Sequence, residues 1–243
     1  MHYTHKRFLP LLAIVLSLSL LITGSAKSDK APPFFNEQTA LDALVTLPPP
    51  PASDSITQER DYIAFYQGRS LIKTPRWEQA IQDSDWSKIE ANFSQAFGTV
   101  ISPKTTPALH DLIQRWVSET KQTAKPIKNH YKRIRPFMVL GQEVCTPQNK
   151  KRLEKSGSYP SAHSAAGWGL ALILTEIRPQ NFRALYQRGR DFGDSRIICG
   201  AHWQSDVETG RLLATQLLSY LHSNQEFLTM LEAAKHETAT QAK

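Results

Sequence analysis

The sequence predicts an all-α protein, folded as a single-domain helical bundle. Along most of the chain, apolar residues recur three and four positions apart, which places them on one face of a helix. No segment alternates apolar and polar residues as a half-buried strand does, and the sequence contains no internal repeat. One clear helical run contains Leu109, Leu112, Ile113, Trp116 and Val117.

The same spacing divides the chain into a series of expected helices. Two of them have recognisable starts, because Ser84-Asp85 precedes Trp86 and Thr106-Pro107 places a proline in a first turn. Residues 141–159 contain glycine, proline and asparagine, and we expect a loop there. The expected helices span residues 57–69, 75–81, 84–97, 105–123, 160–176, 179–192 and 201–222.

The first 26 residues have the order of segments found in a secretory signal peptide. Lys6 and Arg7 precede a nearly unbroken apolar run, Leu9 to Ile22, and small residues follow up to Ala26. A membrane anchor is the alternative, but this run of 14 residues is shorter than the roughly 18–20 that span a bilayer. We therefore expect cleavage after Ala26 and a mature periplasmic protein without a membrane-spanning helix.

The mature chain would begin with a proline-rich arm. Residues 27–56 show little pattern and contain the run Pro48–Pro51, so we expect an extended arm on the surface of a helical domain formed by residues 57–243. Removal of residues 1–26 leaves 217 residues and lowers the formal net charge from +7 to +5. A basic balance suits anionic partners such as phosphate esters, nucleic acid or lipid headgroups, without choosing among them.

The chain has two cysteines, Cys145 and Cys199. In an oxidising compartment, an isolated pair more often forms one disulfide than a metal or redox site. Their spacing also differs from the Cys-x-x-Cys motif of redox proteins. We therefore expect a single disulfide between Cys145 and Cys199.

The first of three chemically distinctive clusters is a basic run from Lys128 to Pro136. A basic run is most often a solvated helix face, and it can also be a nucleic-acid patch. Its end favours a third interpretation, because Arg135-Pro136 is expected to stop a helix and hold the guanidinium at a defined edge. Arginine can bind a phosphate through two hydrogen bonds, and lysine adds a point charge beside it.

The second cluster is a polar, glycine-bearing turn, Gly157 to Pro160, that runs into a helix of small residues. Ser161, Ala162 and His163 are expected at the start of this helix. A helix N-terminus offers N–H groups without partners and the positive end of the helix dipole, which together favour an anion. The alternative is a tight helix-packing surface with a buried core histidine.

The third cluster contains Ser195-Arg196, followed by His202 and Asp206. His202 and Asp206 are four residues apart, so on a helix they would share one face. The carboxylate could hold one imidazole nitrogen and leave the other aimed outward, as in a nucleophilic or basic histidine. Together with His163, the same two residues could instead form a metal site.

Taken together, the clusters resemble the three-part signature of a phosphatase superfamily. The parts are Lys-x6-Arg-Pro, Pro-Ser-x-His and Ser-Arg-x5-His-x3-Asp, here at residues 128–136, 160–163 and 195–206. Class A bacterial nonspecific acid phosphatases, type 2 phosphatidic acid phosphatases and vanadium haloperoxidases share this signature. The resemblance to the class A enzymes extends from about residue 57 to the C-terminus, with one departure. Ala162 stands where that family usually has glycine.

This resemblance implies a helical domain that hydrolyses phosphomonoesters without a metal or other cofactor. His202, oriented by Asp206, would attack phosphorus and form a phosphohistidine. His163 would protonate the leaving alcohol and then activate water, which implies an acid optimum. The residues that would bind and neutralise the phosphoryl group are Lys128, Arg135, Ser161, Ala162 and Arg196.

The resemblance also bears on partners and on competing functions. Phosphomonoesters are the implied substrates, with no nucleic-acid partner beyond nucleotides; phosphotransfer to alcohols is a further implied activity, and the class commonly forms homo-oligomers. One alternative is a vanadate-dependent haloperoxidase, which uses the same cradle. Another is a non-catalytic periplasmic protein that binds anions. A membrane lipid phosphatase needs several spanning helices, and the sequence has none after residue 26.

Overall fold

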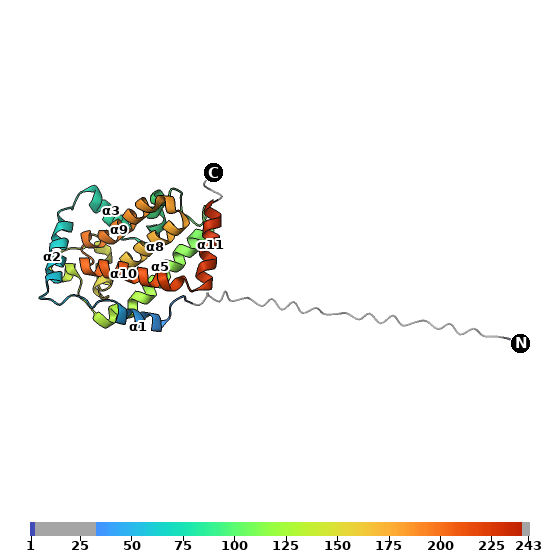
Figure 1. Ribbon diagram of the computed structural model, residues 1–243, viewed down its shortest axis with the longest axis horizontal. Coiled ribbons are helices and arrows are strands. Elements are labelled where there is room, and N and C mark those ends of the chain that lie inside the picture. Colours follow the sequence, from blue (N-terminus) through green and yellow to red (C-terminus); the bar gives the residue numbers. More distant parts are fainter. Residues whose placement is uncertain (3–32, 240–243) are drawn as a thin grey trace. The chain divides into compact units, whose positions relative to one another are not determined.

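The computed structural model describes residues 1–2 and 33–239, and all regular secondary structure in these ranges is helical (Figure 1). The all-α class is therefore confirmed. Residues 3–26 of the expected signal peptide and residues 27–32 of the expected arm lie outside the described residues. The main helices are α1 (Glu37–Thr46), α2 (Ile56–Arg69), α3 (Pro75–Asp83), α4 (Ile89–Phe97), α5 (Pro107–Tyr131), α8 (Ala162–Ile177), α9 (Phe182–Ile198), α10 (Gln204–Leu221) and α11 (Gln225–Ala239).

Short helices connect these elements. They are α6 (Pro136–Val139), α7 (Lys150–Glu154) and the 3-10 turns η1 (Trp86–Lys88), η2 (Pro147–Asn149) and η3 (Pro179–Asn181). Within the described ranges, none of the helices combines the length and apolar character needed to cross a bilayer.

Helix α8 is the buried centre of the domain and packs against both α9 and α10 (Figure 1). Small residues make this packing possible. A side chain at Gly167 would place its first carbon 2.3 Å from Phe192 of α9, and one at Gly210 of α10 would lie 2.5 Å from the carbonyl oxygen of Ser161. Such distances are too short for real atoms. These two glycines therefore let α9 approach α8 and let α10 approach the N-terminus of α8.

Helix α5 carries the apolar face expected from its spacing. Leu109, Leu112 and Ile113 are fully buried, and Trp116 is buried beside them. Helices α1, α8 and α11 pack against α5. The Trp116 indole also donates a hydrogen bond to the carbonyl of Ala166 in α8, at 2.9 Å. Burial of this face anchors the helix whose last turn carries Lys128.

The end of α5 differs from the expected one. The helix continues past residue 123 because Ala124 and Ile127 extend its buried face, and it ends where Lys132 adopts a left-handed φ of 47°. The stop therefore precedes Arg135-Pro136 by several residues. Arg135 instead forms the N-cap of α6. Lys128 and Arg135 consequently approach the same site from different elements.

The segment expected to be an extended arm contains helix α1. Asn36 begins this helix, because its side chain accepts a hydrogen bond from the N–H of Thr39 at 3.0 Å. The preceding Phe34 and Phe35 are buried, and their N–H groups donate to the Glu119 carboxylate of α5 at 2.9 and 3.3 Å. A ten-residue helix with only a few buried apolar positions gives too weak a periodic signal to be distinguished from a loop.

Helices α7 and α11 also form where no helix was expected. Helix α11 begins after Asn224, whose side chain accepts from the N–H of Phe227 at 3.1 Å, and Phe227 and Leu231 are buried. Helix α7 has only five residues, of which Leu153 alone is buried. A helix this short does not show a measurable period in the sequence.

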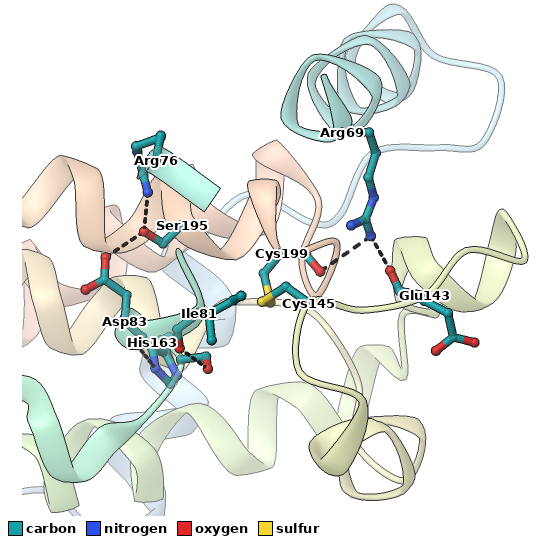
Figure 2. The surroundings of a disulfide bond; sticks show 10 residues. Arg69, Arg76, Ile81, Asp83, Glu143, Cys145, His163, Ser195 and Cys199 are labelled. Carbon is teal, nitrogen blue, oxygen red and sulfur yellow. Dashed lines mark hydrogen bonds between the residues drawn. A yellow bond between two sulfur atoms is a disulfide. The ribbon is translucent and has the colours of Figure 1, made fainter. Parts of the chain in front are cut away.

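The expected disulfide joins Cys145 to Cys199 (Figure 2). Cys199 caps the C-terminus of α9, so the bond ties the loop after α6 to the turn that leads into His202. The backbone reinforces this junction, because the N–H of Cys145 donates to the carbonyl of Cys199 at 3.0 Å. Arg69 of α2 donates to the carbonyl of Glu143 at 2.6 Å. The turn before His202 is thus held by covalent and polar contacts.

Candidate active site

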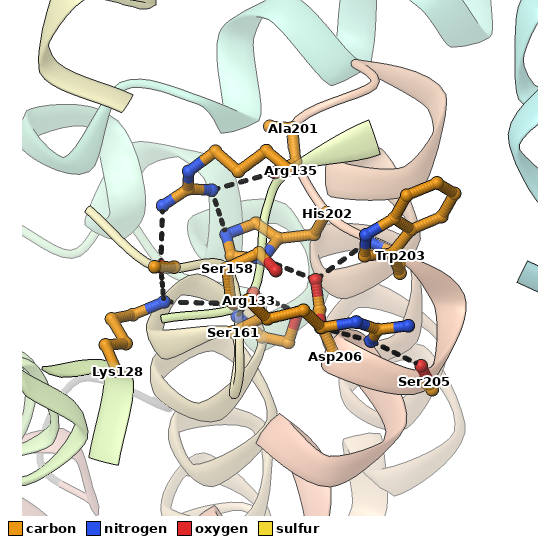
Figure 3. Close-up of polar contacts among 12 residues, drawn as sticks. Lys128, Arg133, Arg135, Ser158, Ser161, Ala201, His202, Trp203, Ser205 and Asp206 are labelled. Atoms are coloured by element: carbon orange, nitrogen blue, oxygen red, sulfur yellow. Dashed lines mark hydrogen bonds and ion pairs between the residues drawn. The ribbon is translucent and has the colours of Figure 1, made fainter. Parts of the chain in front are cut away.

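Residues from all three motifs meet around one pocket of about 240 Å³ (Figure 3). They come from the end of α5, the loop before α6, the start of α8, the end of α9 and the turn between α9 and α10. Asp206 and Ser161 are adjacent to lining residues, because Asp206 contacts His202 and Ser161 directly precedes Ala162. The lining residues expected from the sequence are Lys128, Arg135, Ala162, His163, Arg196 and His202.

His202 is held by Asp206 in a way that differs from the expected one. Helix α10 begins at Gln204, so His202 lies before the helix rather than on its face. Asp206 is in the first turn, and its Oδ2 atom accepts from the N–H of Trp203 at 2.9 Å and from His202 Nδ1 at 3.3 Å. An acidic residue in the first turn commonly reaches back to the start of its helix in this manner. The spacing of four residues therefore brings His202 and Asp206 together because Asp206 caps the start of α10, and not because both lie on one helix face.

The other imidazole nitrogen of His202 faces Arg135. Arg135 Nη1 lies 3.0 Å from His202 Nε2, and a guanidinium can only donate, so Nε2 carries the lone pair and Nδ1 carries the hydrogen. Arg135 is fixed by further bonds to carbonyl oxygens, including that of Ala201 at 2.8 Å and that of Leu153 at 2.9 Å. Burial lowers the pKa of Arg135 to about 10, which leaves it charged at neutral pH. The geometry therefore places an imidazole nitrogen with its lone pair beside a fixed cation.

Arg196 is a buried cation with little to neutralise it. Its side chain is 3% exposed, and among the described residues its Nε and Nη1 atoms have no hydrogen-bond partner. Burial, with Arg135 and Arg152 nearby, lowers the pKa of Arg196 to about 9. A buried charge without hydrogen bonds costs several kcal/mol of free energy unless a ligand supplies the missing partners. An anion in this pocket would provide them.

Lys128 adds a third charge at the same place. Its Nζ atom donates to the carbonyl oxygens of Gly157 and Ser158, both at 3.0 Å. These bonds connect the last turn of α5 to the turn that precedes α8. Burial is the main cause that lowers the pKa of Lys128 well below its ordinary value, and the charge of Arg135 adds to it. A bound anion would oppose both effects and favour the ammonium form.

Ser161 and Ala162 form the start of α8. Ser161 is the N-cap, and its hydroxyl oxygen accepts from the N–H of Ser164 at 3.2 Å, while its own N–H donates to the carbonyl of Asp206 at 2.9 Å. The first N–H groups of a helix have no acceptor within the helix, and those of Ala162 and His163 are in this position. Ala162 has a right-handed φ, since the non-glycine residues with positive φ in the described ranges are Lys73 and Lys132.

His163 is oriented by a residue far away in sequence. Its Nε2 atom lies 2.9 Å from the carbonyl oxygen of Asp83 (Figure 2), and a carbonyl can only accept, so Nε2 carries a hydrogen and Nδ1 is the site that gains or loses a proton. The ring lies between Trp86 and Phe192, with ring centroids 3.9 and 5.3 Å away. Burial, followed by the charge of Arg196, lowers the pKa of His163 well below 6.5.

The Asp83 side chain belongs to a separate buried network. Its carboxylate accepts from Ser195 Oγ at 2.6 Å and forms an ion pair with Arg188. Arg76 donates to the same Ser195 hydroxyl at 2.9 Å (Figure 2). Ser195, the first residue of the third motif, thus helps to fix the end of α3 whose carbonyl holds His163.

Two further residues of the site, Arg133 and Asp61, were not expected from the sequence. Arg133 donates to Asp206 Oδ1 at 2.6 Å (Figure 3). It also donates to Asp61 Oδ2 at 2.7 Å. Asp61 in turn accepts from the N–H of Ser205 at 2.7 Å. Arg133 lies in the same basic run as Arg135, so its positive charge was visible in the sequence. The sequence did not show that its side chain faces Asp206 and Asp61. Asp61 gave no local signal, because its contacts span more than 70 residues.

The same geometry bears on the alternative of a metal site. His163 is held by the backbone of Asp83, whereas His202 is held by Asp206 and Arg135. Within residues 1–2 and 33–239, the structure groups no three His, Cys, Asp or Glu side chains as metal ligands. The metal triad of His163, His202 and Asp206 therefore gains no support from the arrangement.

The chain is similar to known proteins of one superfamily. Residues 116–228, which include all three motifs, match the PAP2 superfamily. A non-specific acid phosphatase of Providencia stuartii is 41% identical over 209 residues, covering 85% of this chain and 84% of the relative. One from Salmonella typhimurium is 35% identical over 227 residues, covering 92% and 91%, and an acid phosphatase of Zymomonas mobilis is 36% identical over 236 residues, covering 95% and 89%. The chain belongs to the non-specific acid phosphatases of the PAP2 superfamily. The family expected from the three motifs is thereby confirmed.

Proposed function

We propose that this acid phosphatase hydrolyses phosphomonoesters in the periplasm through a phosphohistidine formed on His202. One observation carries the proposal. Arg196 is buried, and its Nε and Nη1 atoms have no hydrogen-bond partner among the described residues. It lines the same pocket as His202, whose Nε2 lone pair is defined by contacts on both sides of the ring. An anion bound to Arg196 would therefore lie beside an oriented nucleophile.

Substrate binding would rearrange the contacts of Arg135. A phosphoryl dianion placed among Lys128, Arg135 and Arg196 offers better acceptors than a neutral imidazole. Arg135 Nη1 would exchange its hydrogen bond with His202 Nε2 for one with a phosphoryl oxygen, which frees the lone pair for attack. The N–H groups of Ala162 and His163 would donate to the remaining oxygens, as at other helix N-termini.

Phosphoryl transfer would then proceed in two steps. In the first, a bond forms between His202 Nε2 and phosphorus while the ester P–O bond breaks, and the leaving oxygen takes the electron pair together with a proton from His163 Nδ1. In the second, water attacks phosphorus, gives a proton back to His163 Nδ1, and displaces the imidazole. An alcohol in place of water would give phosphotransfer. The negative charge of the bound phosphate would raise the pKa of His163 and so supply the proton-bearing form.

Asp206 would stabilise the charge that develops on His202. When Nε2 attacks phosphorus, the imidazole ring becomes positive, and the buried Asp206 carboxylate at Nδ1 opposes that charge. Ser161 would act by positioning the start of α8, because its hydroxyl oxygen caps this helix and its N–H donates to the carbonyl of Asp206. These roles assign each motif residue to binding, attack or orientation.

Export to the periplasm is supported by the basic, apolar and small segments of residues 1–26 and by the disulfide, which persists in oxidising compartments. N-terminal sequencing of the protein recovered from the periplasm tests this part. A mature chain that begins at Lys27 is expected, and a chain that retains Met1 in the cytoplasmic fraction would contradict export.

The mechanism is tested by trapping the intermediate. Radiolabelled p-nitrophenyl phosphate is mixed with the enzyme and quenched in alkali, and the protein is expected to carry label that acid releases. His202→Ala should lose the label and at least about 1,000-fold of the turnover rate, as expected for removal of a nucleophile. His222→Ala is the matched control, because this surface histidine contacts Glu176 and is remote from the motifs. Substantial turnover by His202→Ala would contradict the mechanism.

A further inference from the structure

A second hollow of about 810 Å³ adjoins the active-site pocket. The two share three lining residues, Trp86, Lys121 and Arg152, so they form one continuous surface. The proposed mechanism uses none of these three. A surface that continues from a catalytic pocket is where the remainder of a substrate would lie.

The shared surface lies on the leaving-group side of the pocket. Trp86 packs on the ring of His163, with 3.9 Å between ring centroids, and Lys121 Nζ lies 4.0 Å from the centroid of the Trp86 ring. His163 is the proposed proton donor to the leaving oxygen. Groups stacked beyond His163 therefore face the part of the substrate that departs, rather than the phosphoryl group that is transferred to His202.

Positive charge is concentrated on this surface. Lys121, Lys125 and Lys128 are four and three residues apart on α5, so they form a row along one face of the helix, and all three line the active-site pocket. Like charges at this spacing destabilise a helix. Burial lowers the pKa of Lys121, and the nearby charge of Arg152 lowers it further.

Little in the protein neutralises this charge. Within the described residues, no ion pair with a carboxylate involves Lys121, Lys125 or Arg152. Asp85 is the acidic residue that lines the second hollow, and its carboxylate accepts from the N–H and hydroxyl of Ser87 at 3.0 and 2.7 Å. The charge is therefore left for a ligand.

We propose that Lys121, Lys125 and Arg152 bind a second phosphoryl group, carried by the leaving group of the substrate. If the site exists, substrates with two phosphoryl groups are hydrolysed more efficiently than simple monoesters. This catalytic consequence rests on the proposed function. With pyrophosphate, the His202 Nε2–phosphorus bond forms as the bridging P–O bond breaks. The bridging oxygen keeps the electron pair and leaves as orthophosphate. Water then releases the second orthophosphate from the histidine.

The test compares matched substrates. Propyl phosphate and 1,3-propanediol bisphosphate differ only in the second phosphate group, and in pyrophosphate the two phosphoryl groups are closer together. We expect the wild-type enzyme to prefer the bisphosphate or pyrophosphate over propyl phosphate by at least about tenfold in kcat/KM, equivalent to about 1.4 kcal/mol. Whichever of the two substrates has the higher kcat/KM indicates the distance between phosphoryl groups that the surface fits.

Charge removal locates the effect. The double variant Lys121→Gln/Arg152→Gln should reduce the preference to less than about threefold, since two of the three cations are lost. Lys151→Gln is the matched control, because this exposed lysine of α7 is adjacent to Arg152 in sequence and lines neither hollow. The control should keep the wild-type preference. A double variant that also keeps it, with hydrolysis of propyl phosphate intact, overturns the second-phosphate site and leaves the proposed function standing.

Calorimetry on an inactive variant tests the second-phosphate site separately from the proposed function. Full-length mature His202→Ala protein should bind pyrophosphate at least about tenfold more tightly than orthophosphate, and adding Lys121→Gln and Arg152→Gln should remove the difference. If that result appears while wild-type enzyme hydrolyses none of the substrates, the second-phosphate site stands and the proposed function fails. Equal affinity for pyrophosphate and orthophosphate overturns the site.

Discussion

Arg133 and Asp206 form a buried ion pair, with 2.6 Å between Arg133 Nη1 and Asp206 Oδ1. Asp206 uses its other oxygen, Oδ2, to contact His202. The carboxylate therefore lies between a permanent cation and the imidazole. Because Arg133 also bonds Asp61, the position of Asp206 is fixed from the side opposite His202. This arrangement explains how His202 is held in place although it lies before helix α10.

We expect Asp206→Asn to reduce kcat by at least about 100-fold for p-nitrophenyl phosphate, because the neutral amide cannot oppose the charge that forms on His202. KM and the affinity for orthophosphate should change little, since Asp206 does not line the phosphate pocket. Steady-state kinetics and calorimetry measure the two effects. Asp194→Asn, which removes a surface carboxylate paired with Arg211, is the control. A kcat within about threefold of wild type for Asp206→Asn would contradict the assigned role.

His163→Ala should affect substrates according to their leaving group. Nitrophenolate leaves without much protonation, so the phosphoenzyme should still form and its hydrolysis should become slow. An alkyl phosphate needs the proton, and its rate should fall by about 100-fold or more, a typical contribution of general acid catalysis. Rapid-quench kinetics with both substrates resolve the two half-reactions. Equal losses in both half-reactions with both substrates would show that His163 is not the acid and base.

The pH dependence gives an independent check on His163. Its pKa lies well below 6.5 because of burial and Arg196, and only the protonated form can act as acid. The ratio of kcat/KM for an alkyl phosphate to kcat/KM for p-nitrophenyl phosphate should therefore fall as pH rises through that lowered pKa. In His163→Ala the ratio should be low and independent of pH. A ratio that stays flat in the wild type would contradict the assignment.

Several residues that line the pocket could be expected from the sequence, whereas the residues that hold them in place could not. Lys128, Arg135 and Arg196 could be named because each lies at a fixed place in a short motif. Arg133 could not be assigned, because only the folded chain decides which side of the basic run faces Asp206 and Asp61. The carbonyl of Asp83 that holds His163 was also hidden, since any residue can supply a backbone carbonyl.

The fold shows a similar division. Long helices with a wide buried face, such as α5 and α10, were recognised from their spacing, whereas α1 and α7 have too few buried positions to show a period. The placement of His202 before α10 was missed, because a spacing of four residues fits both a helix face and a helix cap. Helix ends depend on such caps, and these are the least visible feature of a sequence.

Reduction of the Cys145–Cys199 disulfide should destabilise the protein by about 4 kcal/mol. The bond closes a segment with a sequence separation of 54, and the estimate follows from the entropy of closing such a loop in the unfolded chain. Guanidinium unfolding with and without reductant measures the difference. The Cys145→Ala/Cys199→Ala variant should unfold at a lower concentration and should not respond to reductant. Two titratable thiols in the unreduced, denatured wild-type protein would contradict the bond.

Ala162 is the position where the chain departs from the signature that it resembles, which usually has glycine there. A glycine there could be needed for a positive φ or for close approach to the ligand. Since Ala162 has a right-handed φ in the first turn of α8, the first need is absent, and the methyl group only narrows the pocket that it lines.

We therefore expect the wild type to be active, with the N–H of Ala162 directed at the phosphate. Ala162→Gly should change kcat/KM by less than about tenfold, which corresponds to about 1.4 kcal/mol, and any gain should be larger for bulky esters than for small ones. Initial rates with p-nitrophenyl phosphate and a bulkier nucleotide, measured for both proteins, test this expectation. Ala165→Gly is the control, because Ala165 lies in the same small-residue segment of α8 but is fully buried away from the pocket. If the wild type is inactive and Ala162→Gly restores turnover, the methyl group blocks the site and this chain is not a working phosphatase.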